Sequence, residues 1–103
     1  MTTLSCIFYK CENIPSTAPL KNWNTKNVTD MCKTFAYCDA LTDLSGLSNW
    51  NTSKVTTMEQ LFVDDTLITS LAPLRTWNTC NVTNMEGTFY GCKNAANVTA
   101  IND

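Results

Sequence analysis

The apolar and polar positions of this chain recur with a 27-residue period. A seven-residue phrase, Trp-Asn-Thr-x-x-Val-Thr, begins at Trp23, Trp50 and Trp77. A period of this length is typical of repeat folds, in which stacked units share one continuous core. Large apolar residues keep the same register: Leu4, Met31, Met58 and Met85; Phe8, Phe35, Phe62 and Phe89; Ile14, Leu41 and Ile68; Leu44, Leu71 and Val98; and Leu20, Leu47, Leu74 and Ile101.

The length of 103 residues corresponds to one domain. We predict a single solenoid domain over 1–103, and no distinctive polar cap is visible at either end. Because solenoids usually cover their apolar ends with atypical repeats, we expect a longer repeat array or ends that pack on another surface. The predicted repeats are 4–30, 31–57, 58–84 and an incomplete 85–103.

Each repeat contains a segment with helical spacing. Val55, Met58 and Phe62 are spaced i, i+3 and i+7, which places them on one face of a helix. Thr56 and Glu59 match a capping box, in which a hydroxyl and a carboxylate satisfy the first amides of a helix. We therefore predict one helix of about two turns in each repeat. These helices are expected to begin after Thr29, Thr56 and Thr83.

A second segment, 41–50, is apolar at every third position. We predict a short strand near Leu44, followed by a turn, with the strands of successive repeats forming a parallel ladder. The predicted fold class is an α/β repeat: a leucine-rich-repeat-like solenoid with a short parallel strand ladder and one short helix per 27-residue repeat. In such a fold, Trp23, Trp50 and Trp77 stack in one column.

Composition narrows the class of protein. A hydrophobic content of 44% with 16% charged residues indicates a folded chain. The net charge of -2 predicts no nucleic-acid partner, and no apolar run is long enough to insert into a membrane. The first residues lack the basic flank and apolar stretch of a signal peptide.

The residues needed for common catalytic sites are missing. The chain has no histidine, which excludes Ser-His-Asp and Cys-His arrangements, and its three glycines are too scattered for a phosphate-binding loop. Asp64 and Asp65 are adjacent and point in different directions, so we expect solvated surface rather than an acid–base pair. We predict no enzyme activity, no catalytic residue, no metal and no cofactor.

The six cysteines fall into two groups. Cys11, Cys38 and Cys92 share one repeat position, where buried reduced thiols act as small hydrophobic side chains. Cys6, Cys32 and Cys80 lie at other repeat positions. Of these, Cys6 and Cys32 are one position apart on adjacent repeats, and they are the pair expected to oxidise in an oxidising compartment. A zinc site built from the first four cysteines is the third alternative, and its ligand spacings are poor.

Two segments resemble a known family. Asn49 to Met58 and Phe35 to Cys38 are similar to the BspA-like leucine-rich-repeat bacterial surface proteins, whose repeats are roughly 26 residues long. The family phrase is Asn-Trp-Asp/Asn-Thr-Ser-Asn-Val-Thr-x-Met, followed by Met-Phe-x-x-Cys. The resemblance spans essentially the whole chain. It departs from the family at Asp65, which replaces the cysteine, and at the second methionine, which is replaced by Thr34, Leu61 and Thr88.

The resemblance implies a surface-exposed array used in adhesion. We expect a non-enzymatic module, at the cell surface or outside the cell, that binds a protein or glycan of a host or neighbouring cell. The alternative is a passive stalk that displays another domain. Polar residues on the strand side, at positions that vary between repeats, are the predicted contacts: Lys21, Asp43, Ser45 and Arg75.

Overall fold

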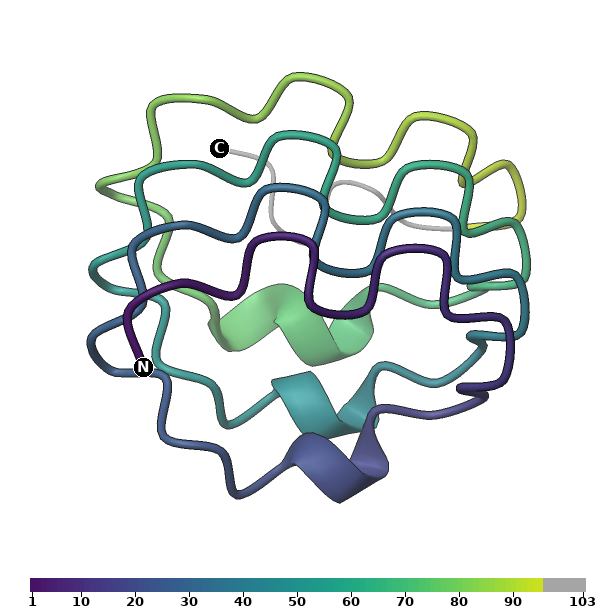
Figure 1. Cartoon of the computed structure of the whole chain (residues 1–103), viewed down its shortest axis with the longest axis horizontal. Helices are drawn as coiled ribbons and strands as arrows, with labels where there is room; N and C mark the ends of the chain where they lie inside the picture. The colour runs from purple at the N-terminus through teal and green to yellow at the C-terminus, as the bar shows by residue number, and fades with distance from the viewer. Residues whose placement is uncertain (96–103) are drawn as a thin grey trace.

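The computed structural model describes residues 1–95. The chain winds in successive turns that lie side by side, one turn for each 27-residue repeat (Figure 1). Parallel bridges join equivalent positions of neighbouring turns: Thr3 with Asp30, Asp30 with Thr57, and Thr57 with Asn84. The predicted positions Val98 and Ile101 lie outside the described residues.

The predicted fold class is wrong. Residues 1–95 contain no strand and no α-helix, and the parallel contacts remain isolated bridges. The regular elements of this part of the chain are three short 3-10 helices. This part of the chain therefore has no leucine-rich-repeat-like strand ladder and no short α-helix in each repeat. The 3-10 helices are η1 (Ala18–Leu20), η2 (Ser45–Leu47) and η3 (Ala72–Thr76).

The segment predicted to be helical is a series of tight turns. The amide of Ile7 donates to the carbonyl of Leu4, and that of Cys11 donates to Phe8. The third residues of these two turns, Cys6 and Lys10, have φ values of 60° and 59°. A type II turn requires positive φ at this position, whereas a right-handed helix excludes it. The equivalent residues of the later repeats also have positive φ: Lys33 and Tyr37, Gln60 and Asp64, and Gly87 and Gly91.

These stepped segments, 4–11, 31–38, 58–65 and 85–92, form what we call the staircase. Its amides alternate between two kinds of acceptor. Those of Met31, Lys33, Phe35 and Tyr37 donate to the carbonyls of Thr57, Glu59, Leu61 and Val63 in the next turn, at 2.9–3.0 Å. The amides of residues 34 and 36 instead donate to carbonyls three residues earlier, and so close tight four-residue turns within their own segment. Successive turns of the stack are thus joined at every second residue. The four-residue backbone turns between these bonds prevent a continuous strand.

The predicted capping box is also absent. The hydroxyl of Thr56 donates to the carbonyl of Thr29 in the preceding turn, at 3.1 Å. The amide of Glu59 donates to the hydroxyl of Thr57, at 3.3 Å. Because Thr83 bonds to Thr56 in the same way as Thr56 bonds to Thr29, these threonines join turns rather than start helices.

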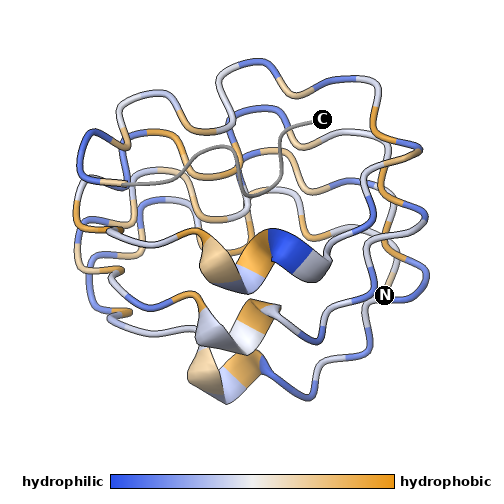
Figure 2. Cartoon of the chain, turned by 180° about the vertical axis from the view of Figure 1, so that it is seen from behind, coloured by the Kyte–Doolittle hydropathy of each residue, from blue (hydrophilic) through white to orange (hydrophobic). Residues whose placement is uncertain are grey.

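The opposite side carries the 3-10 helices, which are stacked one on the next (Figure 1). The strand predicted near Leu44 is wrong, since η2 begins at the next residue. A 3-10 helix has 3.0 residues per turn, so an apolar residue at every third position gives it one continuous buried face. Pro19 in η1 and Pro73 in η3 have a fixed φ suited to the first helical turn. Figure 2 shows hydrophobic and polar stretches recurring along successive turns.

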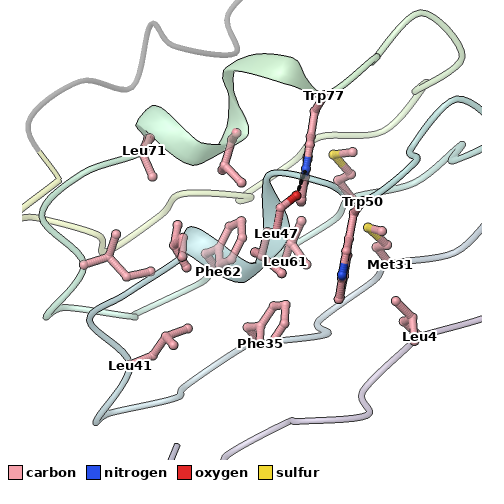
Figure 3. Close-up of a cluster of buried hydrophobic side chains, with 14 of the residues drawn as sticks. Leu4, Met31, Phe35, Leu41, Leu47, Trp50, Leu61, Phe62, Leu71 and Trp77 are labelled. Carbon is pink, nitrogen blue, oxygen red and sulfur yellow. Dashed lines mark hydrogen bonds between the residues drawn. The ribbon is translucent and has the colours of Figure 1, made fainter. Parts of the chain in front are cut away.

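The hydrophobic core lies between the staircase and the 3-10 helices (Figure 3). Trp23 and Trp50 stack with ring centroids 6.2 Å apart and an interplanar angle of 9°. The indole of Trp50 donates to the carbonyl of Leu20 at 3.0 Å, and that of Trp77 donates to Leu47 at 2.8 Å. A second column, with centroids 5.3–5.7 Å apart, consists of Phe8, Phe35, Phe62 and Phe89.

Short polar side chains fix the corners of each turn. Asp30, Asp43 and Asn51 each accept the amide of the residue two positions later, at 2.8, 2.9 and 3.0 Å. Such side-chain turns redirect the backbone without a helix or a strand. Thr52 is buried beside one corner. Its hydroxyl donates to the carbonyl of Asn78 and accepts the amide of the same residue, at 3.1 and 2.9 Å.

Candidate binding surface

The four predicted contact residues lie on one side of the molecule, around the 3-10 helices. Lys21 is the C-terminal cap of η1, Ser45 is the first residue of η2, and Arg75 lies in η3. All three are exposed, and Asp43, two residues before η2, is half-buried. Because residues 1–95 contain no strand, these residues do not form a strand side. We call their surface the 3-10 face.

Asp43 is held in place by its neighbours. One oxygen accepts hydrogen bonds from the hydroxyls of Ser16 and Ser45, at 2.7 and 2.9 Å, and the other accepts the amide of Ser45. The hydrogen bond from Ser16, followed by that from the Ser45 amide, lowers the pKa of the Asp43 carboxyl. Asp43 and Ser45 thus form a fixed, negatively charged corner with few free hydrogen-bonding positions.

Lys21 and Arg75 occupy equivalent positions two turns apart, with Ser48 at the same position of the turn between them. The hydroxyl of Ser48 donates to the carbonyl of Ser45, and its own carbonyl accepts the hydroxyl of Thr76. The 3-10 face therefore presents two exposed cations at the ends of a row, with a neutral residue between them. This arrangement suits an extended polar or acidic partner.

The column of cysteines contains one acidic residue, Asp65, for which the prediction of solvated surface is wrong. Asp65 is completely buried, not solvated. Cys38 and Cys92, one turn before and after it, donate their thiols to the carbonyls of Phe8 and Phe62, at 3.1 and 3.0 Å. The missing cysteine in this repeat position was the sequence signal for an unusual buried group.

Burial determines the protonation of the ionisable side chains in this column. One oxygen of Asp65 accepts the amide of Cys38 at 2.7 Å, and the other has no partner within residues 1–95. Loss of hydration raises the pKa of the Asp65 carboxyl to about 8. The same cause raises the pKa of the Cys38 thiol to about 12 and that of Cys92 to about 11. Both thiols are therefore protonated at neutral pH and are poor nucleophiles.

The remaining cysteines are also free thiols. Cys11 is half-buried at the open end of the column, and Cys6 and Cys80 are exposed. Cys6 and Cys32 are brought onto adjacent turns, where the amide of Cys6 donates to the carbonyl of Cys32 at 3.0 Å. Burial, followed by the nearby carboxylates of Glu59 and Asp30, raises the pKa of the Cys32 thiol.

Two further properties concern residues 1–95. No group of three or more cysteine, aspartate or glutamate side chains is placed to hold a metal ion. No helix in this part of the chain has the length and apolar character needed to cross a membrane.

The fold and this surface define a repeat protein whose 27-residue turns are joined through alternate staircase amides. Residues 2–102 match the family described as "Mycoplasma protein of unknown function, DUF285", and the chain belongs to that family. No curated protein and no solved structure matches the sequence significantly.

Proposed function

We propose that the protein is a non-enzymatic binding module of the bacterial cell surface, which contacts a protein or glycan of a host or neighbouring cell through the 3-10 face. The observation that carries the proposal is the row formed by Lys21, Ser48 and Arg75. These equivalent residues differ in charge, although the turns that present them are built alike.

The surroundings of the row support this proposal. Its two cations are exposed. The apolar residues beside the row point into the core: Leu47 and Leu74 are buried, and the equivalent Leu20 is partly buried. A substitution in the row can therefore change recognition without disturbing the core. The resemblance to BspA-like surface proteins supports the cell surface as the location and adhesion as the role.

A passive stalk is the second candidate, and a different surface favours it. Thr29, Thr56 and Thr83 are exposed, identical and bonded in the same way to the preceding turn. A spacer needs only such regular stacking contacts and no variation between copies.

Binding to a panel of extracellular-matrix proteins and to a glycan array tests the proposal. In the double variant Lys21→Ser/Arg75→Ser, every position of the row carries the serine found at position 48. We expect at least a tenfold loss of affinity, about 1.4 kcal/mol or more. The matched control Lys26→Ser/Lys54→Ser removes the same charge from exposed positions away from the row.

The control also shows whether a loss of affinity is specific to the 3-10 face. Equal losses in the two double variants would mean that net charge attracts the ligand, and the 3-10 face would have no special role. An absence of binding to every probe would contradict the proposal and favour the stalk.

A further inference from the structure

The column of cysteines is irregular at one level, where Asp65 takes the place of a cysteine. At the two levels with a buried cysteine, the thiol donates a hydrogen bond to the carbonyl of a phenylalanine in the preceding turn. Cys38 donates to Phe8 at 3.1 Å, and Cys92 donates to Phe62 at 3.0 Å. The carboxyl group of Asp65 therefore lies at a position where the other turns have a hydrogen-bond donor.

The acceptor that corresponds to Asp65 is the carbonyl of Phe35, and it has no partner. In the next turn, the carbonyl of Phe62 accepts two hydrogen bonds, one from the thiol of Cys92 and one from the amide of Asp65. The amide of Cys38 would be the equivalent donor to Phe35, but it donates to Oδ1 of Asp65 at 2.7 Å. The Phe35 carbonyl therefore accepts no hydrogen bond within residues 1–95.

The second carboxyl oxygen of Asp65 is unpaired in the same part of the chain. Asp65 is completely buried, and its Oδ2 has no hydrogen-bond partner. Buried polar groups without partners are costly and uncommon in folded proteins. An ionised carboxylate can only accept hydrogen bonds, whereas a protonated one also has an O–H donor. A single proton on Oδ2 thus supplies a donor for the unpaired carbonyl of Phe35.

The surroundings of Asp65 favour this proton. Burial raises the pKa of its carboxyl, the hydrogen bond from the Cys38 amide opposes this, and the negative charges of Asp39 and Asp64 raise it further. Asp64 is the neighbour of Asp65 in sequence, and Asp39 lies in the preceding turn. The thiols of Cys38 and Cys92, in the turns before and after, are protonated at neutral pH and carry no charge.

We propose that Asp65 is a pH-sensitive switch: its protonated carboxyl donates from Oδ2 to the carbonyl of Phe35, and loss of the proton opens the cysteine column locally and exposes the thiol of Cys38. The ionised carboxylate has no donor for Phe35, and a buried charge without a partner is strongly unfavourable. Local opening relieves this cost by hydrating the carboxylate. Cys38 is the residue exposed, because its amide is bonded to Asp65 and its side chain occupies the adjacent level.

The pH at which the switch operates follows from the direction of the pKa shift. The folded-state pKa of Asp65 is raised to about 8, so the closed state is fully stable at acidic pH and loses stability as pH rises towards that value. Asp65 is the last residue of its staircase segment, so the opening is confined to that end of the segment. The inference is independent of the proposed binding role, because Asp65 is buried and takes no part in the 3-10 face.

Alkylation of the native 103-residue chain with N-ethylmaleimide, from about pH 6 to about pH 8.5, tests the proposal when mass spectrometry assigns the rate at each cysteine. Asp65→Asn is the matched variant, because its amide nitrogen can donate to Phe35 and its oxygen can accept from Cys38 at every pH. The ratio of the wild-type rate to the Asp65→Asn rate at Cys38 removes the ordinary increase in thiolate with pH. We expect a ratio near 1 at pH 6 and of about 10 or more at pH 8.5.

Two controls separate local opening from other effects. Asp64→Asn keeps the carboxyl of Asp65 and is expected to behave like the wild type. The exposed Cys6 is expected to give a ratio near 1 at every pH. The charge of an ionised Asp65 would by itself raise the pKa of the Cys38 thiol and slow its alkylation, so a faster rate at Cys38 reports exposure.

The carbon-13 chemical shift of the Asp65 carboxyl, measured in the wild type over the same pH range, tests the proposal without a variant. We expect a protonated carboxyl at pH 6 that loses its proton near pH 8. A carboxyl that is already ionised at pH 6 would overturn the proposal, and so would a Cys38 ratio that stays near 1 at pH 8.5. An equal rise at every cysteine would also overturn it, because that result indicates global unfolding rather than a local switch.

Discussion

The staircase and the 3-10 side of the molecule use the same repeat differently. On the staircase, every second amide bonds to the next turn, and two inward positions keep their character in all copies, one with leucine or methionine and one with phenylalanine. On the 3-10 side, fewer backbone bonds join the turns, such as that from Thr17 to Asp43, and the outward residues change from Lys21 to Ser48 to Arg75. Stacking is therefore stabilised mainly at the staircase, which leaves the 3-10 face free to vary.

The largest expected effect comes from the staircase. Phe35 is completely buried and stacks on Phe8 and Phe62 at 5.3 and 5.7 Å. Phe35→Ala leaves a cavity inside the aromatic column, and it should lower the free energy of unfolding by about 3–5 kcal/mol. Arg75→Ala, on the exposed 3-10 face, should change it by less than about 0.5 kcal/mol. Urea unfolding checks both, and similar losses would remove the distinction between the two sides.

Gly46 is an exception on the 3-10 side, because its backbone lies in tight contact with the preceding turn. A Cβ atom at this position would overlap the backbone carbonyl of Thr17. Gly46→Ala therefore separates η2 from the turn before it, and we expect a loss of about 3 kcal/mol in unfolding free energy. Ser48→Ala is the control, since it removes only a local hydroxyl, and its effect should be under about 0.5 kcal/mol. A stable Gly46→Ala variant would show that the 3-10 helices are not in close contact.

Asp65 is the residue of the staircase that we expect to make the stability of the protein depend on pH. The folded-state pKa of its carboxyl, about 8, is raised above the ordinary value of 3.8. Its neutral form is therefore the one that the folded protein favours, so stability is fully present below about pH 4 and falls as pH rises towards 8. We expect Asp65→Asn to remove this slope and to be more stable than the wild type at pH 8 by about 2–4 kcal/mol.

Thermal unfolding from pH 4 to pH 9 measures this effect. Asp64→Asn, at the neighbouring and less buried residue, is the control and should keep the wild-type slope. A wild-type stability that rises between pH 4 and pH 8 would contradict the buried neutral carboxyl.

The smallest expected effect separates two threonines in the same repeat. Buried Thr52 both donates to and accepts from Asn78, whereas exposed Thr56 only donates to Thr29. Thr52→Val leaves an amide and a carbonyl without partners, and it should cost about 1–2 kcal/mol. Thr56→Val should cost less than about 0.5 kcal/mol, because water replaces its hydroxyl. Denaturant midpoints at constant slope check the difference.

The sequence predicted the register of the repeat but not its local conformation. The stacking of Trp23 on Trp50 and the column of Phe residues follow directly from the 27-residue period. The staircase could not be distinguished from a helix, because consecutive four-residue turns also place apolar residues four positions apart, as in Met58 and Phe62. Its left-handed positions are mostly occupied by side chains that give no signal, such as Lys33 and Tyr37. Only Gly87 and Gly91, at these positions of the last turn, indicated them.

The candidate surface rests on variation between copies, which selected Lys21 and Arg75. Both residues are exposed on the side of the 3-10 helices, and their role in binding stays a prediction. The pattern could not show that Asp43 is engaged by Ser16, because that contact joins two neighbouring turns rather than neighbours in the sequence. Nor could it show that Asp65 is buried, since adjacent acidic residues usually lie in solvent.

Successive turns of the stack are joined through alternate amides of the staircase. NMR couplings transmitted through hydrogen bonds test this pairing most directly, because they identify the donor and acceptor of each bond. We expect couplings from the amide nitrogens of residues 31, 33, 35 and 37 to the carbonyl carbons of residues 57, 59, 61 and 63. Couplings from these amides to carbonyls one helical turn earlier, in the i to i−4 pattern, would instead show an α-helix and contradict the staircase.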